Sequence, residues 1–172
     1  MKMIWLISFE ESYFKQEQIE SLIFIILGIL SICLAFIFLG IIKYSFFKGM
    51  AVPLLAVGLI QLIVGTTIYL RSPEDKYRVT QMLINKRSKI KTEEIPRMEK
   101  VMQNFTVYKW IEIVLILASI ILLIIFYYSP QTYWKGLALG LLIQAIIMLS
   151  LDVLAENRGQ VYIEQLQKIS KR

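Results

Sequence analysis

Two uncharged runs of more than twenty residues constrain this chain more than any other feature. Residues 22–42 form a run of 21, and residues 49–70 form a run of 22. At a rise of about 1.5 Å per residue, a helix of roughly 20 residues crosses the hydrocarbon core of a bilayer. Two further apolar stretches, 110–128 and 136–155, carry a single acid each. We therefore predict an all-α integral membrane protein with four transmembrane helices.

A charged block separates the second apolar stretch from the third. It runs from Arg71 to Lys109 and holds 10 of the 19 Lys and Arg residues. With four spans, this block lies on the same side of the membrane as both termini. That side then carries 16 Lys and Arg, against 3 in the two short turns, and the positive-inside rule makes it cytoplasmic. The expected fold is an up-down-up-down bundle with cytoplasmic N- and C-termini, in a bacterial inner membrane because the tails are short and no signal peptide is recognised.

We expect the whole chain, 1–172, to form a single membrane domain. Its first residues alternate aromatic and charged side chains, which indicates either an interfacial helix or a disordered leader. The expected segments are an N-terminal segment at 1–20, spans at 22–42, 49–70, 110–128 and 136–155, a cytoplasmic helical hairpin at 73–109, and a tail at 156–172 that continues as an amphipathic helix.

The charged block contains two helix-start signals. Ser72 and Pro73 followed by two acids predict one start, and Thr92-Glu93-Glu94 with Pro96 predicts another. Three methionines on this hairpin, Met82, Met98 and Met102, would offer an adaptable apolar surface to a partner. Alternatively, they hold the hairpin together.

Two acids lie near the cytoplasmic ends of predicted spans, Glu112 in the third and Asp152 in the fourth. Acids in spanning helices are rare and usually paired. We expect an ion-pair cluster of Arg71 with Glu112 or Asp152. Solvation by interfacial water is one alternative, and proton or cation handling is another.

Small and amide residues recur at helical spacing in two spans. Gly136, Gly140 and Gln144 follow one side of the fourth span, and the second span offers Gly58, Gln61 and Gly65. Small residues allow close approach of membrane helices, and amides can hydrogen-bond across the contact. We expect these six residues to pack span two against span four. The functional alternative is that Gln61 and Gln144 line a polar cavity.

The two predicted hairpins share a motif that suggests an internal duplication. The sequence FFKGMA at 46–51 opens the second span, and YWKGLA at 133–138 opens the fourth. The interval from Gly49 to Arg71 equals that from Gly136 to Arg158, and an Ile-Glu pair precedes the first span (19–20) as another precedes the third (111–112). We hypothesise two repeats related by a pseudo-twofold axis along the membrane normal. The alternative is that any membrane hairpin favours aromatics and Lys at its turn.

The composition argues against most chemistry. The chain has no His, and its single cysteine, Cys33, lies within an apolar run. Phosphate-loop, zinc-protease and serine-hydrolase motifs are missing, so we expect no enzymatic activity, no cofactor and no metal site. Aromatic residues are scarce on the basic face of the charged block, which argues against nucleic-acid binding.

In size and layout the chain is similar to small four-span membrane proteins, including immunity proteins against pore-forming toxins. Three roles follow from these considerations. The first is an interaction protein that docks a partner or a second copy through its cytoplasmic hairpin, and an immunity or defence role is a variant of it. The second is a small channel or transporter subunit. The third is an accessory or assembly factor of a larger membrane complex. The expected partners are the lipid bilayer and either further copies of this chain or another membrane protein.

Overall fold

The computed structural model describes residues 2–85 and 88–170, and the side chains of residues 8–85 and 88–169. The described residues form four long α-helices, α1 (Lys2–Gly40), α2 (Ser45–Asn85), α3 (Ile95–Ile125) and α4 (Thr132–Ser170), with a short π-helix, η1 (Ile90–Glu94), leading into α3. All four long helices are long and apolar enough to cross a membrane. The prediction of an all-helical multi-pass membrane protein is therefore confirmed.

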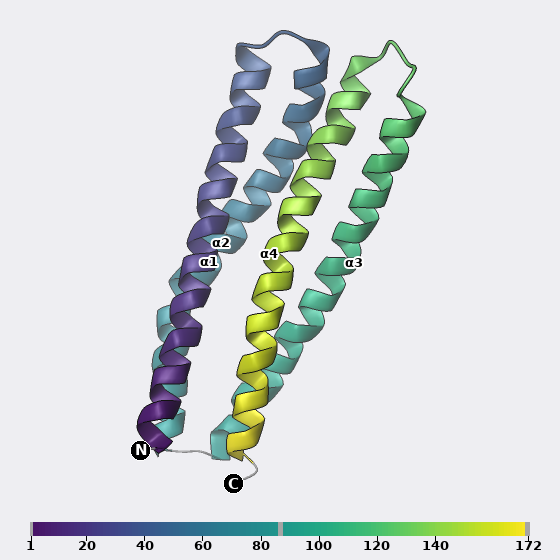
Figure 1. The fold of residues 1–172 in the computed structure, drawn as a ribbon. Coiled ribbons are helices and arrows are strands. Elements are labelled where there is room, and N and C mark those ends of the chain that lie inside the picture. The colour runs from purple at the N-terminus through teal and green to yellow at the C-terminus, as the bar shows by residue number, and fades with distance from the viewer. Residues whose placement is uncertain (1, 86–87, 171–172) are drawn as a thin grey trace.

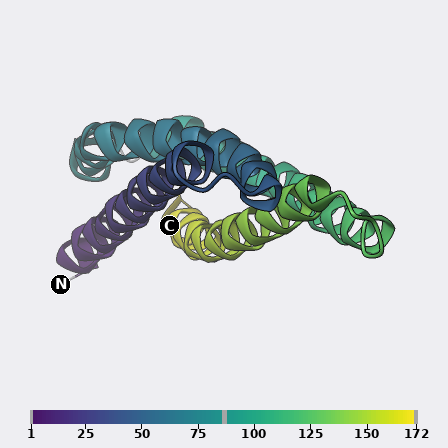
Figure 2. The same ribbon diagram turned by 90° about the horizontal axis from the view of Figure 1, so that it is seen from above.

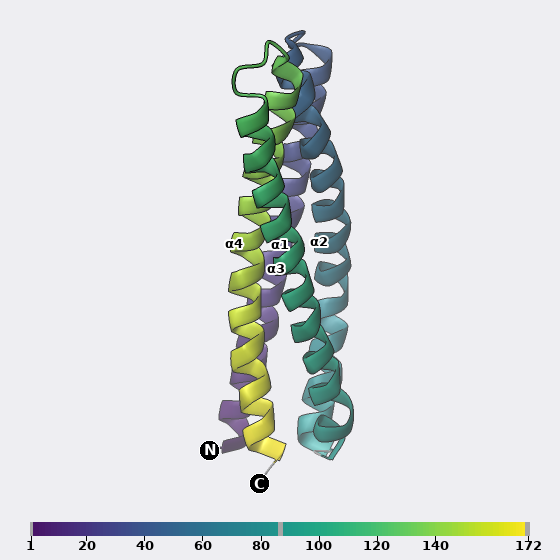
Figure 3. The same cartoon turned by 90° about the vertical axis from the view of Figure 1, so that its right-hand side faces the viewer.

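The helices run along a common long axis and form a rod (Figure 3). Both termini lie at the same end as the end of α2 and the start of η1, and the α1–α2 and α3–α4 connections lie at the other end (Figure 1). Helix α1 packs on α2, α3 packs on α4, and α2 packs on α4. The backbone of α3 approaches neither α1 nor α2 in the described part of the chain. One of the four helices is therefore held mainly by a single neighbour.

The helix start predicted at Ser72–Pro73 does not occur. Helix α2 passes through Pro73 without ending, although proline removes a helical hydrogen bond. Ser72 is fully buried, and its hydroxyl donates to the Phe14 carbonyl oxygen on α1 at 3.4 Å, so tertiary contact occupies the expected capping side chain. The second predicted start agrees more closely, because Pro96 lies in the first turn of α3.

We call residues 8–20, 71–85, 88–109 and 156–169 the charged half, and residues 21–70 and 110–155 the apolar half. At the charged half, the start of α1 and the end of α2 spread apart (Figure 2), and the end of α4 packs against both of them. An aromatic and aliphatic core fills the space where these helices and η1 meet. Its buried members are Tyr13, Phe14, Val79, Met82, Leu83, Ile90, Ile95, Met98, Tyr162, Ile163 and Leu166.

This core corrects two expectations from the sequence. Met82 and Met98 are buried, so the exposed methionine surface expected on the hairpin is not present. Residues 8–20 belong to α1, and Tyr13 and Phe14 pack inside the bundle instead of lying along a membrane surface. The reason is the length of α2 and α4, whose charged halves provide α1 with apolar partners. Residue 1, residues 86–87 of the predicted hairpin and residues 171–172 of the predicted tail lie outside the described residues.

A buried carboxylate network closes the charged half. Glu94 is fully buried, and its oxygens accept from Arg97 at 2.6 Å and from Arg78 at 3.2 Å. The Tyr162 hydroxyl donates to the same carboxylate at 3.4 Å. Asp75 also pairs with Arg78, at 2.9 Å. Each charge of this buried group therefore has an opposite charge beside it, as burial requires.

Candidate functional site: a cavity between the two helical hairpins

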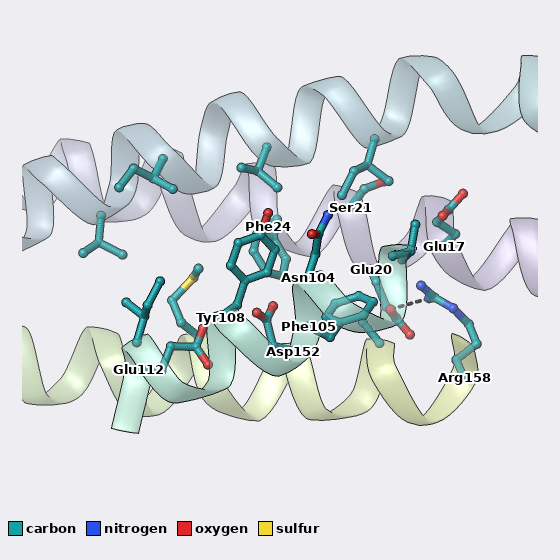
Figure 4. Close-up of a pocket in the computed structure, with 18 of the residues that line it drawn as sticks. Glu17, Glu20, Ser21, Phe24, Asn104, Phe105, Tyr108, Glu112, Asp152 and Arg158 are labelled. Carbon is teal, nitrogen blue, oxygen red and sulfur yellow. Dashed lines mark ion pairs between the residues drawn. The ribbon is translucent and has the colours of Figure 1, made fainter. Parts of the chain in front are cut away.

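A cavity of about 460 Å³ lies where the apolar half meets the charged half, and all four long helices contribute to its wall. Most of the lining is aliphatic or aromatic, including Phe24, Phe105 and Tyr108. These rings and Asn104 project into the space between the helices (Figure 4). Six charged side chains also line it, Glu17, Glu20, Arg71, Glu112, Asp152 and Arg158.

Two of these acids, Glu112 on α3 and Asp152 on α4, face each other at the cavity. They are only 5% and 7% exposed, and their carboxyl groups are within hydrogen-bonding reach of each other. Such a bond requires one shared proton, because two ionised carboxylates repel each other. The second carboxyl oxygen of Glu112 has no hydrogen-bond partner among the described residues. Asp152 directs its carboxyl group away from α4 into the space between the helices (Figure 4).

Arg71 lines the same cavity, but it does not form the expected ion pair with either acid. Its guanidinium instead contacts Asp75, one turn further along α2, at 3.0 Å. The physical reason is that Asp75 lies one helical turn away on α2 and forms a local pair with Arg71, whereas the α3 backbone, which carries Glu112, does not approach α2. The structure thus gathers Arg71, Glu112 and Asp152 around one space without joining them in a cluster.

A different ion pair crosses the cavity, between Glu20 on α1 and Arg158 on α4 (Figure 4). The Arg158 guanidinium also lies over the Tyr13 ring, 5.2 Å from its centroid, in a cation–π arrangement. In the sequence, Glu20 and Arg158 stand out only as marks of the repeat. Arg158 follows Gly136 at the same interval that separates Arg71 from Gly49, and this was the one signal that could have identified it.

Glu17 completes the set of cavity acids. It is 9% exposed, and one of its carboxyl oxygens has no hydrogen-bond partner among the described residues. Burial raises the pKa of Glu17 above its ordinary value, and nearby arginines such as Arg158 and Arg71 oppose this rise only in part. Nothing in its local sequence distinguished Glu17 from an ordinary surface acid.

The apolar half contains a second polar feature, a chain of amides across three helices. Gln61 on α2 donates to Gln144 on α4 at 3.4 Å, and Gln144 donates to Ser31 on α1 at 2.8 Å. Both glutamines are buried, and the Gln61 amide also contacts the Met148 sulfur. The two glutamines meet as the spacing suggested, whereas Ser31 was missed because an isolated serine has no periodicity. Neither glutamine lines the cavity.

The glycines divide between two interfaces. Gly140 lies against Met50 and Pro53 of α2, and Gly136 lies against Phe46, so this pair joins α2 to α4 as expected. Gly58 and Gly65 instead face α1: a Cβ on Gly65 would lie 2.8 Å from the Ser21 carbonyl oxygen. The expectation that all six residues pack span two against span four is therefore wrong for these two glycines. Their side of α2 is taken by α1, the sequence neighbour with which α2 forms a hairpin.

The contact between the two FFKGMA-like motifs is reciprocal. A Cβ on Gly136 would overlap the Phe46 carbonyl oxygen, and a Cβ on Gly49 would overlap the Tyr133 carbonyl oxygen. In the motif alignment, Gly49 corresponds to Gly136 and Phe46 to Tyr133. Gly136 therefore contacts Phe46 of the first motif, and Gly49 contacts Tyr133, the equivalent residue of the second motif. A local twofold axis produces this exchange of equivalent contacts.

The described residues contain no group of three or more His, Cys, Asp or Glu side chains placed to hold a metal ion. Comparisons of the chain with protein-family models, with curated protein sequences and with solved structures find no match. The interpretation of the cavity therefore rests on its own geometry.

Proposed function

We propose that this protein is a non-enzymatic transporter or channel subunit of a bacterial inner membrane, with its site in the cavity between the two hairpins. In this proposal the chain crosses the bilayer up-down-up-down. Both termini and the helical ends that flank η1 lie in the cytoplasm. The apolar half lies in the bilayer.

The charge distribution supports this orientation. Among the described residues, 11 Lys and Arg side chains lie in the segments 8–20, 71–85, 88–109 and 156–169 at the η1 end of the rod, against 3 in the two turns at the other end. The apolar half displays large side chains outward, such as Phe36, Ile63 and Ile124, which are 63%, 65% and 68% exposed. These side chains suit contact with lipid.

The observation that carries the functional proposal is the pair Glu112 and Asp152 beside an apolar cavity. Sequence analysis favoured a structural role, in which Arg71 would neutralise one of these acids. Arg71 pairs with Asp75 instead, so this structural explanation loses its main support. A buried acid pair without a cation, in helices that cross the membrane, marks substrate and ion pathways more often than it stabilises a fold.

The reciprocal glycine contact gives independent support. Many membrane carriers consist of repeats whose interface holds the substrate site. Here the cavity is lined by α1 and α2 on one side and by α3 and α4 on the other, so it lies at the interface of the two hairpins. A site shared between repeats suits a protein that moves one hairpin against the other.

A proteoliposome flux assay tests the proposal. Purified protein is reconstituted into liposomes that contain a pH-sensitive dye, and proton or K⁺ movement is followed after an imposed gradient. We expect flux above that of empty liposomes, reduced at least tenfold in the double variant Glu112→Gln with Asp152→Asn. The control is Glu164→Gln, which removes an exposed acid from the same helix. Absence of flux, or flux that the double variant retains, would contradict the proposal.

A second candidate is an interaction or accessory subunit, with an immunity role as its variant. The observation that favours it is the exposure of α3, whose backbone approaches only that of α4 among the long helices. Its outer face presents Val114, Leu117 and Ile121, each more than half exposed. Mass determination of the protein in a mild detergent separates the two candidates, because a defined complex with another membrane protein would favour this one.

A further inference from the structure

We propose that the ligand of the cavity is an amphiphilic organic cation with a single positive charge. The inference names the substrate class of the proposed transporter and therefore rests on that proposed function. Three properties of the cavity carry it, namely its size and wall, the balance of its charges and the position of its aromatic rings.

The size and wall of the cavity suit a small organic molecule. Its volume of about 460 Å³ falls in the range of sites that enclose drug-sized ligands. The wall is formed largely by aliphatic and aromatic groups, such as Val64, Ile68 and Leu141. A hydrated inorganic ion gains nothing from such a wall. An organic body, in contrast, gains free energy by burying its apolar surface there.

The charges that line the cavity leave one negative charge without a partner near its α3–α4 side. Arg158 neutralises Glu20, and Arg71 is already paired with Asp75. The remaining acid on the α1 side, Glu17, is 9% exposed, and burial raises its pKa, which disfavours its ionised form.

Glu112 and Asp152 line the cavity together, and two ionised carboxylates at one site repel each other, so one shared proton would leave the pair with one net negative charge. No cation forms an ion pair with either acid among the described residues. A ligand with one positive charge would complement this pair.

Glu112 also supplies an unsatisfied acceptor. Glu112 is 5% exposed and lines the cavity. The second oxygen of its carboxyl group lacks a hydrogen-bond partner among the described residues. A buried polar atom without a partner costs free energy, which a bound donor or cation would recover. This atom therefore marks the position at which the charged group of the ligand would bind.

Aromatic rings occupy the same part of the cavity. Phe24, Phe105 and Tyr108 project into the space into which Asp152 directs its carboxyl group (Figure 4). Ring faces attract organic cations, and the attraction strengthens where water is excluded. The absence of a metal-binding group of three acids or other ligands among the described residues separates this site from one built for a divalent ion.

Equilibrium binding to the full-length protein in lipid nanodiscs tests the inference. The probe is radiolabelled tetraphenylphosphonium, and the matched control is tetraphenylborate, which has nearly the same shape and the opposite charge. We expect saturable binding of the cation and none of the anion. Non-saturable binding of the cation, or equal binding of both ions, would overturn the inference.

Variants locate the bound probe. Asp152→Asn and Glu112→Gln should each weaken tetraphenylphosphonium binding at least tenfold, whereas Glu164→Gln should leave it unchanged. Tyr108→Leu changes a side chain that is 48% exposed and is therefore compatible with folding, and it should weaken binding about three- to tenfold. Binding that survives both Asp152→Asn and Tyr108→Leu would overturn the assignment to this cavity.

The binding and flux experiments distinguish a failure of the ligand inference from a failure of the transporter proposal. If tetraphenylphosphonium binds as described but the protein moves no ion or probe across liposomes, the ligand class stands and the transporter proposal fails. If acid-dependent flux of protons or K⁺ is measured while tetraphenylphosphonium neither binds nor competes, the transporter proposal stands and the ligand class is wrong.

Discussion

The charged half and the apolar half of this molecule are held together by different means. In the charged half, Phe14 and Tyr162 are almost completely buried, and the carboxylate of Glu94 is enclosed by two arginines. In the apolar half, large side chains point outward, and the buried positions belong mainly to small residues and amides such as Ala51 and Gln61. The same four helices thus change their packing chemistry along their length.

The difference follows from the solvent proposed for each half. In water, burial of apolar surface drives association, so a large aromatic core is stabilising. In lipid that drive is missing, because the tails are as apolar as the side chains, and close backbone contact and hydrogen bonds take its place. The cavity lies at the boundary between the two halves, where the backbone of α3 stays apart from those of α1 and α2 in the described structure.

Replacing an aromatic core residue in the charged half should cause the largest loss of stability. Phe14→Ala should lower the free energy of unfolding by about 3–5 kcal/mol, because the ring is only 2% exposed. The matched variant Phe36→Ala removes a ring that is 63% exposed in the apolar half and should cost less than about 0.5 kcal/mol. Reversible unfolding in mixed micelles measures both. Equal losses would remove the distinction between the halves.

Replacing a glycine at the α2–α4 contact should cause the second-largest loss of stability. Gly136→Ala should destabilise the protein by about 1–3 kcal/mol, because the added methyl group would overlap the Phe46 carbonyl oxygen and separate the helices. Gly40→Ala is the control, since a Cβ there meets nothing within 4 Å. Unfolding in mixed micelles again serves as the measurement. If Gly136→Ala is tolerated as well as Gly40→Ala, close packing does not hold the apolar half together.

The charged half should also respond to pH through Glu10. This side chain is 2% exposed and accepts a hydrogen bond from Thr80 at 2.8 Å, and burial raises its pKa to about 7. Because the folded state holds the proton more tightly than the unfolded state, stability should fall as the pH rises from about 4.5 to about 7.

Glu10→Gln should remove the fall in stability that ionisation of Glu10 causes. The variant should therefore be more stable than the wild type by roughly 1–2 kcal/mol at pH 8. The measurement is thermal unfolding in detergent between pH 4 and pH 8. Glu11→Gln is the control, because Lys76 lowers the pKa of that exposed acid. A constant difference between Glu10→Gln and the wild type across this pH range would show that Glu10 does not titrate there.

The smallest expected effect concerns the amide chain of the apolar half. Gln144→Met should cost about 0.5–1 kcal/mol, because hydrogen bonds between membrane helices contribute little in net terms. The change removes the bonds to Gln61 and Ser31 but keeps a side chain of similar length. Gln160→Met, at an exposed position of the same helix, is the control in the same unfolding assay. A loss above about 3 kcal/mol would make the amide chain a principal support of the bundle.

Much of the fold could be predicted because it depends on properties of single segments of the sequence. Uncharged runs of about twenty residues indicate the spans whatever their neighbours are. The spacing of Gln61 and Gln144 also pointed to the contact that these residues make. Such features depend on the length of a helix and on which face a residue occupies.

Features that depend on which helix packs against a given face of another helix were predicted less well. Gly58 and Gly65 share a side of α2, but only the structure shows that α1 covers that side. Met98 was expected at the surface because the hairpin was considered without α1 and α4, which bury it. The helix start at Ser72 failed for the same reason, since α1 takes the Ser72 hydroxyl as a partner.

The candidate site was predicted in part. Glu112 and Asp152 were identified because acids in apolar segments are unusual, whereas Glu17 and the Glu20–Arg158 pair were not assigned to a site. Helical spacing places Arg71 close to Asp75, and this local pair competes with the long-range pairs that were expected. The choice between them depends on the position of α3, which no local pattern in the sequence determines.

The most direct test of the account is the accessibility of single cysteines in intact bacterial cells. Cys33 is the only cysteine, so Cys33→Ala provides a background without thiols. In this background, Gln131→Cys marks the α3–α4 turn, and Glu164→Cys marks the charged half of α4. A membrane-impermeant maleimide should label Gln131→Cys in intact cells and Glu164→Cys only after permeabilisation. Labelling of Glu164→Cys in intact cells would contradict the cytoplasmic position of the charged half.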